Sequence, residues 1–499
     1  MSETEILMAA PEGEIRDAYA ALQKDMGRLE GIKEYVMGNH RPPYMPKSAN
    51  AEYKLLAARS VTNWMPMVVD ATAQALFVDN FRLSSDKQSF DTAKDTEIGA
   101  TSPSWLHWQG SRMDAKQATL FRAALEYGHS FTITERDPKR KKIRTRGVSP
   151  LRAIAMFEDP LADLEPTSGL EVVRRPTGSG KSEVPGKGRY YDEVYRWSFT
   201  FKRGMKNIVV QEVVEHEANR CPMTRLATHV DLDGNTTGLI EPLFALQDRV
   251  NQTVFDLLVA QTYTSFEVRT VSGMAPPLKM TRDEDGNATP VLDDNGQPVA
   301  DEIQVNGQRW LYAKDKDTKF GHLPAGELAG LIAAVELAMR QLSAVAQVPA
   351  HYMLGQIANV NADGLRAAAE SLSKKNMEIA SSFGESIERI FRLFAEISGE
   401  TVSEDEFGEV VWRDLTNASI AQTADALGKF ADQLDIPKRG LWSRVPGVTR
   451  TELNTWNDML AEDRKARSDL MANIPDEVLA LIGDDAVYEA TGTNADAVE

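Results

Sequence analysis

Cysteine is almost absent from this chain of 499 residues: only Cys221 is present, so no disulfide can form within one chain. The seven histidines show no pair at metal-ligand spacing, and Cys221 has no partner cysteine, so the sequence predicts no metal site. Neither H-E-x-x-H nor G-x-S-x-G occurs. The sequence therefore predicts no catalytic residue, no cofactor and no enzyme activity.

Long apolar runs and an excess of positive charge are missing as well. No apolar run reaches the ~20 residues that span a bilayer, and the first residues, MSETEILMAAPEGE, are acidic, unlike a signal peptide. We therefore expect no membrane partner. The 56 Lys and Arg residues face 74 Asp and Glu residues, which gives a net charge of -18. Proteins that hold nucleic acid tightly usually show the opposite balance. If DNA is a partner of this chain, it is therefore expected to be one that must not adhere.

The most strongly patterned stretch is residues 323–399, where the sequence predicts a helix, a polar loop and a long helix. Pro349 ends the first helix, because proline lacks an amide donor and disfavours helical geometry in the residue before it. The loop, residues 353–361, carries no charge, and the second helix is expected to begin near Asp363 and to run past Gly384. Apolar residues at helical spacing mark the first helix: Leu328, Leu331, Ile332, Val335, Met339, Leu342 and Val345.

A second long helix is predicted over Leu239–Thr262, with Pro242 in its first turn, where a missing amide costs nothing. Residues 265–322 then change to strands and turns, and Asp285-Gly-Asn and Asp294-Asn-Gly are hairpin signals. The sequence thus predicts a β-rich module inserted between two long helices. Because the chain leaves and returns through one module, the two helices are expected to run antiparallel.

The remaining segments predict an α+β fold that is mainly helical. Helices are expected over 11–38, as a pair within 50–78, over Ser102–Tyr127, Ile420–Leu434, Arg450–Ser468 and Pro475–Ile482. Strands are expected over Ser130–Glu135, Ile143–Val148, Leu170–Arg175, Tyr190–Lys202, Asn207–His216, Phe266–Val271, Gln308–Tyr312 and Glu409–Trp412. The tail from Gly483 is acidic and small, which is typical of disorder.

Two kinds of motif suggest ligands, and simpler interpretations compete with both. Gly178–Ser182 ends like a phosphate-binding loop, but the first glycine of that motif is replaced by Arg175 and no helix follows. A hairpin explains it better. The acidic turns at Asp231, Asp283 and Asp293 resemble calcium loops but lie between strands, so we expect hairpin turns there.

Basic residues gather in two places. Lys139–Lys142, with Arg144 and Arg146, could contact nucleic acid, but the run lacks interleaved aromatics and is expected at a hairpin tip, which favours a solvated loop. Lys374 and Lys375 follow the neutral loop, and Glu370 is placed to pair with Lys374. For these two lysines an ordinary solvated helix face and a basic ring beside a channel both remain open.

Several short stretches, in their order and spacing, resemble the portal proteins of tailed double-stranded DNA phages, in the form typical of siphophages of Gram-positive hosts. The resemblance covers roughly residues 25–460. It rests on Tyr35–His40, Trp105–Trp108, Glu126–Phe131, Ile240–Leu243, Gln247–Asn251, Val348–Tyr352, Asn361–Glu370, Phe383-Gly384, Val411–Asp414 and Ile436–Trp442.

The resemblance implies a ring, usually of twelve subunits, at one capsid vertex, with double-stranded DNA passing through its centre during packaging and ejection. The implied portal fold has an α+β wing, a two-helix stem, a β-rich clip insertion and a helical crown. Its parts are the wing (1–238 and 364–415), stem (239–264 and 323–347), clip (265–322), tunnel loop region (348–363), crown (416–482) and a disordered acidic tail (483–499).

The resemblance also implies partners and a location. The expected partners are further copies of the chain, DNA held weakly and without sequence specificity, the terminase large subunit, a head–tail connector (adaptor) protein, and the major capsid protein with its scaffold. The location would be the portal vertex of the virion, after assembly in the host cytoplasm. The expected DNA-channel residues are Gln356, Asn359, Asn361, Lys374 and Lys375. Because the loop has no cation, electrostatic gripping of phosphates by the loop itself is not expected.

Composition agrees with a conduit. About twelve copies would carry a formal charge on the order of -200, which would discourage DNA from adhering. The rival hypotheses are an ATPase or other terminase component of the packaging machinery, and another capsid-associated structural protein. The first would need a phosphate-binding loop after a buried strand, and Gly178–Ser182 is the only candidate. The second would lack the order of helix, β insert, helix, loop and helix.

Overall fold

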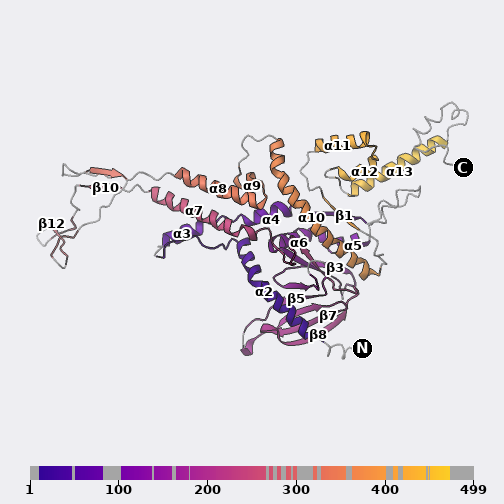
Figure 1. The fold of residues 1–499 in the computed structure, drawn as a ribbon, viewed down its shortest axis with the longest axis horizontal. Helices are drawn as coiled ribbons and strands as arrows, with labels where there is room; N and C mark the ends of the chain where they lie inside the picture. The colour runs from indigo at the N-terminus through magenta and orange to yellow at the C-terminus, as the bar shows by residue number, and fades with distance from the viewer. Residues whose placement is uncertain are drawn as a thin grey trace. The chain divides into compact units, whose positions relative to one another are not determined.

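The chain forms two units, each discontinuous in sequence (Figure 1). The larger unit comprises Met1–Asn39, Asn63–Phe244 and Ser343–Glu499, and the smaller comprises His40–Thr62 and Ala245–Leu342. The computed structural model describes residues 10–47, 51–82, 103–137, 140–159, 165–178, 180–265, 269–272, 278–282, 288–293, 296–299, 319–322, 328–355, 362–399, 408–413, 420–445, 448 and 450–472.

Two antiparallel sheets organise the larger unit. One has three strands in the order β3 (Ile143–Val148), β2 (His129–Arg136) and β9 (Met223–Ala227). The other has five strands in chain order: β4 (Ala153–Met156), β5 (Ser168–Arg174), β6 (Gly186–Tyr191), β7 (Tyr195–Lys202) and β8 (Lys206–Glu215). Each strand of the second sheet pairs with the next along the chain, which is the arrangement that short turns produce.

Helix α2 (Glu12–Val36) packs against the five-stranded sheet (Figure 1). Its buried residues recur every three or four positions, so they form one apolar face. That face meets the aromatic side of the sheet, where Tyr190, Trp197 and Phe199 are buried. The helix residues in this core are Ile15, Ala18, Leu22 and Met26.

A long helix, α10 (Ala362–Ser398), supplies the second core of the larger unit. Phe391 stacks on Phe81, with ring centroids 4.1 Å apart, and lies 5.4 Å from the ring of Trp108. Phe81 belongs to β1 (Val78–Arg82), which pairs with β14 (Glu409–Trp412). Burial of Phe383, Phe391 and Phe394 stabilises the C-terminal half of this helix.

The smaller unit joins His40–Thr62, here called the N-terminal arm, to helix α7 (Phe244–Ser265). Gln247 and Asn251 are fully buried polar residues of α7, and their side chains form hydrogen bonds with the N-terminal arm. The Gln247 amide donates to the carbonyl of Thr62 at 2.8 Å. The Asn251 amide lies 2.9 Å from Nδ1 of His40. In addition, α3 (Ala51–Arg59) contributes Leu56 and Ala57 to a cluster with Phe255 of α7.

Strands separate α7 from the next long helix, α8 (Leu328–Ala346), as the sequence predicts. A guanidinium–amide hydrogen bond between Arg249 and Gln341 joins the two helices. The described strands form two antiparallel pairs: β10 (Arg269–Ser272) with β13 (Lys319–His322), and β11 (Met280–Arg282) with β12 (Ala288–Pro290). The expected strand Gln308–Tyr312 and the turn Asp285-Gly-Asn lie outside the described residues.

Two predicted elements are wrong because each is interrupted. The expected helix Ser102–Tyr127 is two helices, α5 (Pro103–Gly110) and α6 (Met113–Tyr127), since Arg112 adopts a left-handed conformation with φ of 58°. The expected strand Tyr190–Lys202 is β6 and β7. Between them the Asp192 carboxylate accepts backbone N–H groups of Val194 and Tyr195, which closes a turn that the apolar pattern conceals.

The other described helices lie close to the predictions. The expected pair within 50–78 is α3 and α4 (Met65–Ala73). Near the C-terminus, α11 (Ile420–Gln433) and α13 (Arg450–Ala472) match expected helices, and α12 (Lys438–Leu441) was not predicted. The expected helix Pro475–Ile482 and the tail from Gly483 lie outside the described residues. The mixture of helix and strand confirms the α+β class.

Candidate functional site

The end of α8 is built from local hydrogen bonds. Gln347, the residue after the helix, has φ of 53°, and this left-handed turn brings the backbone N–H of Val348 to the carbonyl of Ser343 at 3.1 Å. The Ser343 hydroxyl donates to the carbonyl of Val348 at 2.5 Å. Helix α9 (Ala350–Leu354) follows Pro349. The first helix of the patterned stretch therefore stops where the proline predicts.

The predicted loop begins later than expected. Met353 and Leu354 were expected in the loop but belong to α9, and Met353 is buried. Gly355 ends α9 with φ of 65°, a conformation that glycine adopts without a steric penalty. Three expected channel residues, Gln356, Asn359 and Asn361, lie outside the described residues, and α10 begins at Ala362.

Lys374 lies on an exposed part of α10 and forms an ion pair with Glu370, one helical turn earlier, at 2.8 Å. This confirms the pairing that the i, i+4 spacing predicts. The hydrogen bond and charge of Lys374 lower the pKa of Glu370. The positive charge of Lys374 is thus partly balanced within its own helix.

Lys375, the next residue, has different surroundings. Its side chain is half-buried, and Nζ donates a hydrogen bond to the carbonyl of Ala346, the last residue of α8, at 2.9 Å. Burial lowers the pKa of Lys375 to about 8. The two lysines that the sequence groups together therefore contact different parts of the molecule.

Helix α8 leaves large apolar side chains in solvent. Ile332, Leu337 and Val345 are 49%, 57% and 55% exposed. Within the described residues, α8 is long and apolar enough to cross a membrane by length and composition alone, which corrects the expectation that no segment meets this criterion. One such helix is weak evidence for a membrane, because apolar helices of soluble proteins pass the same test. Exposed apolar side chains of this size can contribute to a surface that binds a partner.

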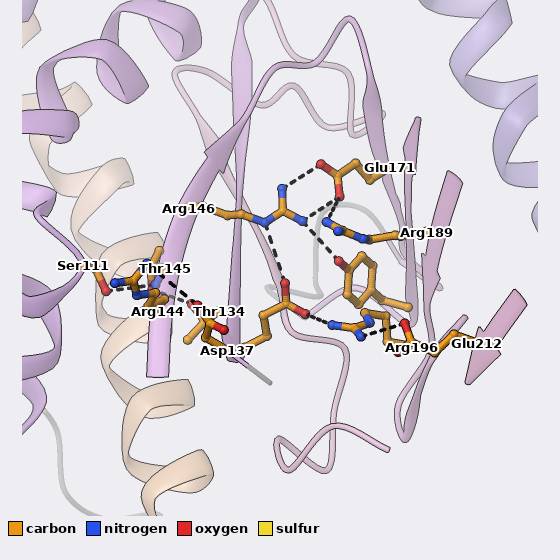
Figure 2. Close-up of polar contacts among 12 residues, drawn as sticks. Ser111, Thr134, Asp137, Arg144, Thr145, Arg146, Glu171, Arg189, Arg196 and Glu212 are labelled. Atoms are coloured by element: carbon orange, nitrogen blue, oxygen red, sulfur yellow. Dashed lines mark hydrogen bonds and ion pairs between the residues drawn. The ribbon is translucent and has the colours of Figure 1, made fainter. Parts of the chain in front are cut away.

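A chain of alternating charges links the two sheets of the larger unit, and Figure 2 shows it in close-up. Arg146 of β3 donates two hydrogen bonds to Glu171 of β5, at 2.7 and 2.6 Å. Arg146 also lies 3.8 Å from Glu135 of β2, and Glu135 accepts a hydrogen bond from Arg196 of β7 at 2.9 Å. The sequence favoured a solvated hairpin tip for the basic run that includes Arg146, with nucleic-acid contact as the alternative, but the Arg146 guanidinium is paired with carboxylates of the neighbouring strands.

The charges at the ends of this network are also paired. Arg189 lies 3.5 Å from Glu171, and Arg196 also donates to Glu212 at 3.3 Å. Burial alone would raise the pKa of Glu171, but hydrogen bonds from Arg146 outweigh it and lower that pKa. Arg144, also in the predicted basic run, points away and lies 3.9 Å from Asp137.

The described motifs that suggested ligands are turns, and the motif at Asp283 lies outside the described residues. Residues 177 and 184 pair between the antiparallel strands β5 and β6, so Gly178–Ser182 lies in a hairpin. A Cβ on Gly178 would lie 2.6 Å from the carbonyl oxygen of Ser182, and φ there is 77°, so this glycine is needed for the turn. The Asp231 carboxylate accepts backbone N–H groups of Asp233 and Asn235. Across the part of the chain that the structure describes, no cluster of potential metal ligands occurs.

Glu126 lies at the end of α6, close to the segment that leads into α7. The carbonyl of the preceding residue, Leu125, accepts the backbone N–H of Leu239 at 2.8 Å, and a Cβ on Gly238 would lie 2.1 Å from the carbonyl oxygen of Glu126. This close approach leaves the side chain of Glu126 half-buried. Burial raises the pKa of Glu126 to about 7, a shift that nearby Asp70 increases and Arg122 reduces.

The substitution Glu126→Gln is expected to stabilise the protein near neutral pH. The folded pKa of about 7 exceeds the ordinary 4.5, so the stability supplied by the protonated carboxyl is complete below 4.5 and is lost as pH rises through 7. Glutamine cannot ionise, so the variant should gain about 1–2 kcal/mol at pH ~8 and almost nothing at pH ~4.5. Urea unfolding at both pH values measures the difference, with Glu378→Gln as an exposed control. An equal effect at both pH values would contradict the assigned cause.

Comparison with known proteins identifies the class. The family model of phage portal proteins described as SPP1 Gp6-like matches residues 17–466. This chain therefore belongs to the SPP1 Gp6-like family of phage portal proteins. Membership confirms the family resemblance noted in the sequence and the expectation that the chain is a structural component and not an enzyme.

Two curated relatives carry the name portal protein. That of Mycobacterium phage D29 is 23% identical over 428 residues, covering 83% of this chain and 81% of the relative. That of Mycobacterium phage L5 is 24% identical over 437 residues, covering 84% and 81%. Among solved structures, a chain of the native gene transfer agent virion aligns with a TM-score of 0.38 at 11% identity, covering 84% of this chain and 100% of that chain. A chain from the neck of the empty gene transfer agent particle gives 0.35 at 10% identity, covering 80% and 93%.

Proposed function

We propose that this chain forms a ring at a unique capsid vertex and serves as the conduit for double-stranded DNA during packaging and ejection. The observation that carries the proposal is the match of the portal family to residues 17–466. The order of elements supports it, because α7, a strand-rich insert, α8, α9 and α10 follow one another as the family resemblance implies. In this role the ring would first dock the terminase and then the head–tail connector proteins.

The parts of the portal can be assigned to elements on this proposal. The two sheets, α2 and the long helix α10 form the wing, α7 and α8 form the stem, and the strand pairs between them form the clip. Helices α11 and α13 form the crown, and residues 348–363 form the tunnel loop region. Each part then contributes one layer or surface of a ring.

The exposed apolar side chains of α8 support assembly with further copies of the chain. In a ring each subunit contacts two neighbours, so a surface left open on one copy is covered by the next. Burying a leucine-sized side chain contributes about 1.5–3 kcal/mol, and Leu337 and Val345 are both more than half exposed. A twelve-subunit ring would bury such side chains at every interface.

Weak contact with DNA follows from the charge. The net charge of -18 per chain repels phosphates, and a conduit must let duplex DNA slide. A strongly basic channel would meet about one phosphate charge per 1.7 Å of duplex and would hold it. Gln356, Asn359, Asn361 and Lys374 remain the proposed DNA contacts, and Lys375 remains a proposed residue of the channel wall. The capsid protein, its scaffold, the terminase large subunit and the connector remain proposed partners at the virion vertex, after assembly in the host cytoplasm.

Electron microscopy of the purified protein tests the proposal. We expect rings with an axial hole, and classification of end views gives the copy number. The same rings should be found at one vertex of particles that contain this chain. Monomers alone, both under assembly conditions and in particles, would overturn the proposal.

A further inference from the structure

The last turn of α8 and the fourth turn of α10 meet through one charged side chain. Nζ of Lys375 donates to the carbonyl of Ala346 at 2.9 Å. The final carbonyls of a helix have no partner within the helix, and they carry the negative end of its dipole. An ammonium group at this point therefore satisfies an acceptor that α8 itself cannot satisfy.

The surroundings of this contact are packed. Ala346 and Val348 are buried on the side of α8, and Leu372 and Asn376 are buried on the side of α10. A cation in such a place is disfavoured relative to water, in agreement with the lowered pKa of Lys375. A methionine or leucine would fill the same space without that cost, so the ammonium group is explained by the hydrogen bond that it makes.

Lys374 provides the contrast within the same helix. It is exposed, and its partner, Glu370, lies one turn away on α10 itself. Its ion pair therefore fixes nothing outside α10, whereas the contact of Lys375 joins residues 29 positions apart. Two adjacent lysines thus have separable roles, one local and one between helices.

We propose that Lys375 is a positioning residue that fixes the end of α8 against α10, and is not a phosphate contact. Its contact joins the last residue of α8 to α10, the two long helices between which α9 lies in the chain. Any effect of Lys375 on DNA passage rests on the proposed portal function, whereas the hydrogen bond between Lys375 and Ala346 does not.

Hydrogen–deuterium exchange on the purified full-length chain tests the contact directly. In Lys375→Met we expect the backbone amides of 346–348 to exchange about tenfold faster than in the wild type, because a hydrogen bond from a charged group is lost. Lys374→Met is the matched control and should leave these amides unchanged. Lys375→Arg keeps a donor on a long side chain and should restore most of the protection. Unchanged exchange in Lys375→Met would overturn the proposal, even if rings form normally.

DNA packaging in particles separates positioning from phosphate contact. A phosphate contact predicts that Lys374→Met and Lys375→Met lose packaged DNA to a similar degree and that added salt weakens the wild type in the same way. Positioning predicts a loss of several-fold or more in Lys375→Met that added salt does not change, together with faster exchange at 346–348, and recovery of both in Lys375→Arg. A loss in Lys375→Met that follows the salt dependence of the wild type, without faster exchange, would overturn the assignment. If the wild type forms no rings, the portal proposal fails, while the exchange experiment still decides the role of Lys375.

Discussion

Substituting Leu337 or Val345 by glutamate is expected to abolish ring assembly while leaving the subunit folded. Both side chains are more than half exposed in the subunit, so a charge there meets water until a neighbour covers it. Covering it would then bury an unpaired carboxylate, which costs several kcal/mol, and the lost apolar contact adds about 1.5–3 kcal/mol. Because every subunit contributes this face, the cost recurs around the ring.

Size-exclusion chromatography with light scattering, followed by electron microscopy, measures the result. Leu337→Ala should weaken rings without eliminating them, since it removes contact area but adds no charge. Leu232→Glu is the matched control: Leu232 is 87% exposed at the tip of the turn that the Asp231 carboxylate closes, and its substitution should leave rings intact. Normal rings in both α8 variants would show that this face of α8 lies outside the subunit interface.

The sequence predicted α8 itself more reliably than the orientation of its faces. Helical spacing identified Leu328 to Val345 as one stripe, yet Met339 and Leu342 are buried while Ile332 and Val345 are exposed. Leu337, the most exposed of the large apolar residues on α8, lies off that stripe. The spacing of apolar residues predicts a helix. Which of those residues are buried depends on the segments that pack against the helix, and the sequence of the helix itself does not contain that information.

The candidate site shows the same division between local and distant contacts. The Glu370–Lys374 pair was predictable because its spacing is one helical turn. The contact of Lys375 with Ala346 was not, because the acceptor is a backbone carbonyl 29 residues away that leaves no mark on the sequence. The ion pairs of Arg146 were not predictable for a related reason: its partners lie on β2 and β5, and strand alternation does not reveal which charges meet across sheets.

The substitution Arg146→Met is expected to destabilise the larger unit by about 2–3 kcal/mol, less than the ~3–5 kcal/mol for breaking a fully buried ion pair, because the Arg146 side chain is 32% exposed. Of their ion pairs within the described residues, Glu171 would keep the 3.5 Å contact with Arg189, and Glu135 would keep Arg196. Thermal and urea unfolding, followed by the fluorescence of buried tryptophans, measure the loss. Arg144→Met is the control, since Arg144 is more exposed and its 3.9 Å ion pair should contribute less than about 1 kcal/mol.

A second substitution separates the charge of Arg146 from its position between the sheets. If the loss in Arg146→Met comes from a carboxylate left unpaired, then Arg146→Met with Glu171→Leu should be more stable than Arg146→Met alone, because no buried charge remains without its partner. The single variant Glu171→Leu should be less stable than the double variant that carries both Arg146→Met and Glu171→Leu. Equal destabilisation by Arg146→Met and Arg144→Met would contradict a role for the network. A recovery in the double variant would show that the pairing of these charges adds little net stability to the larger unit.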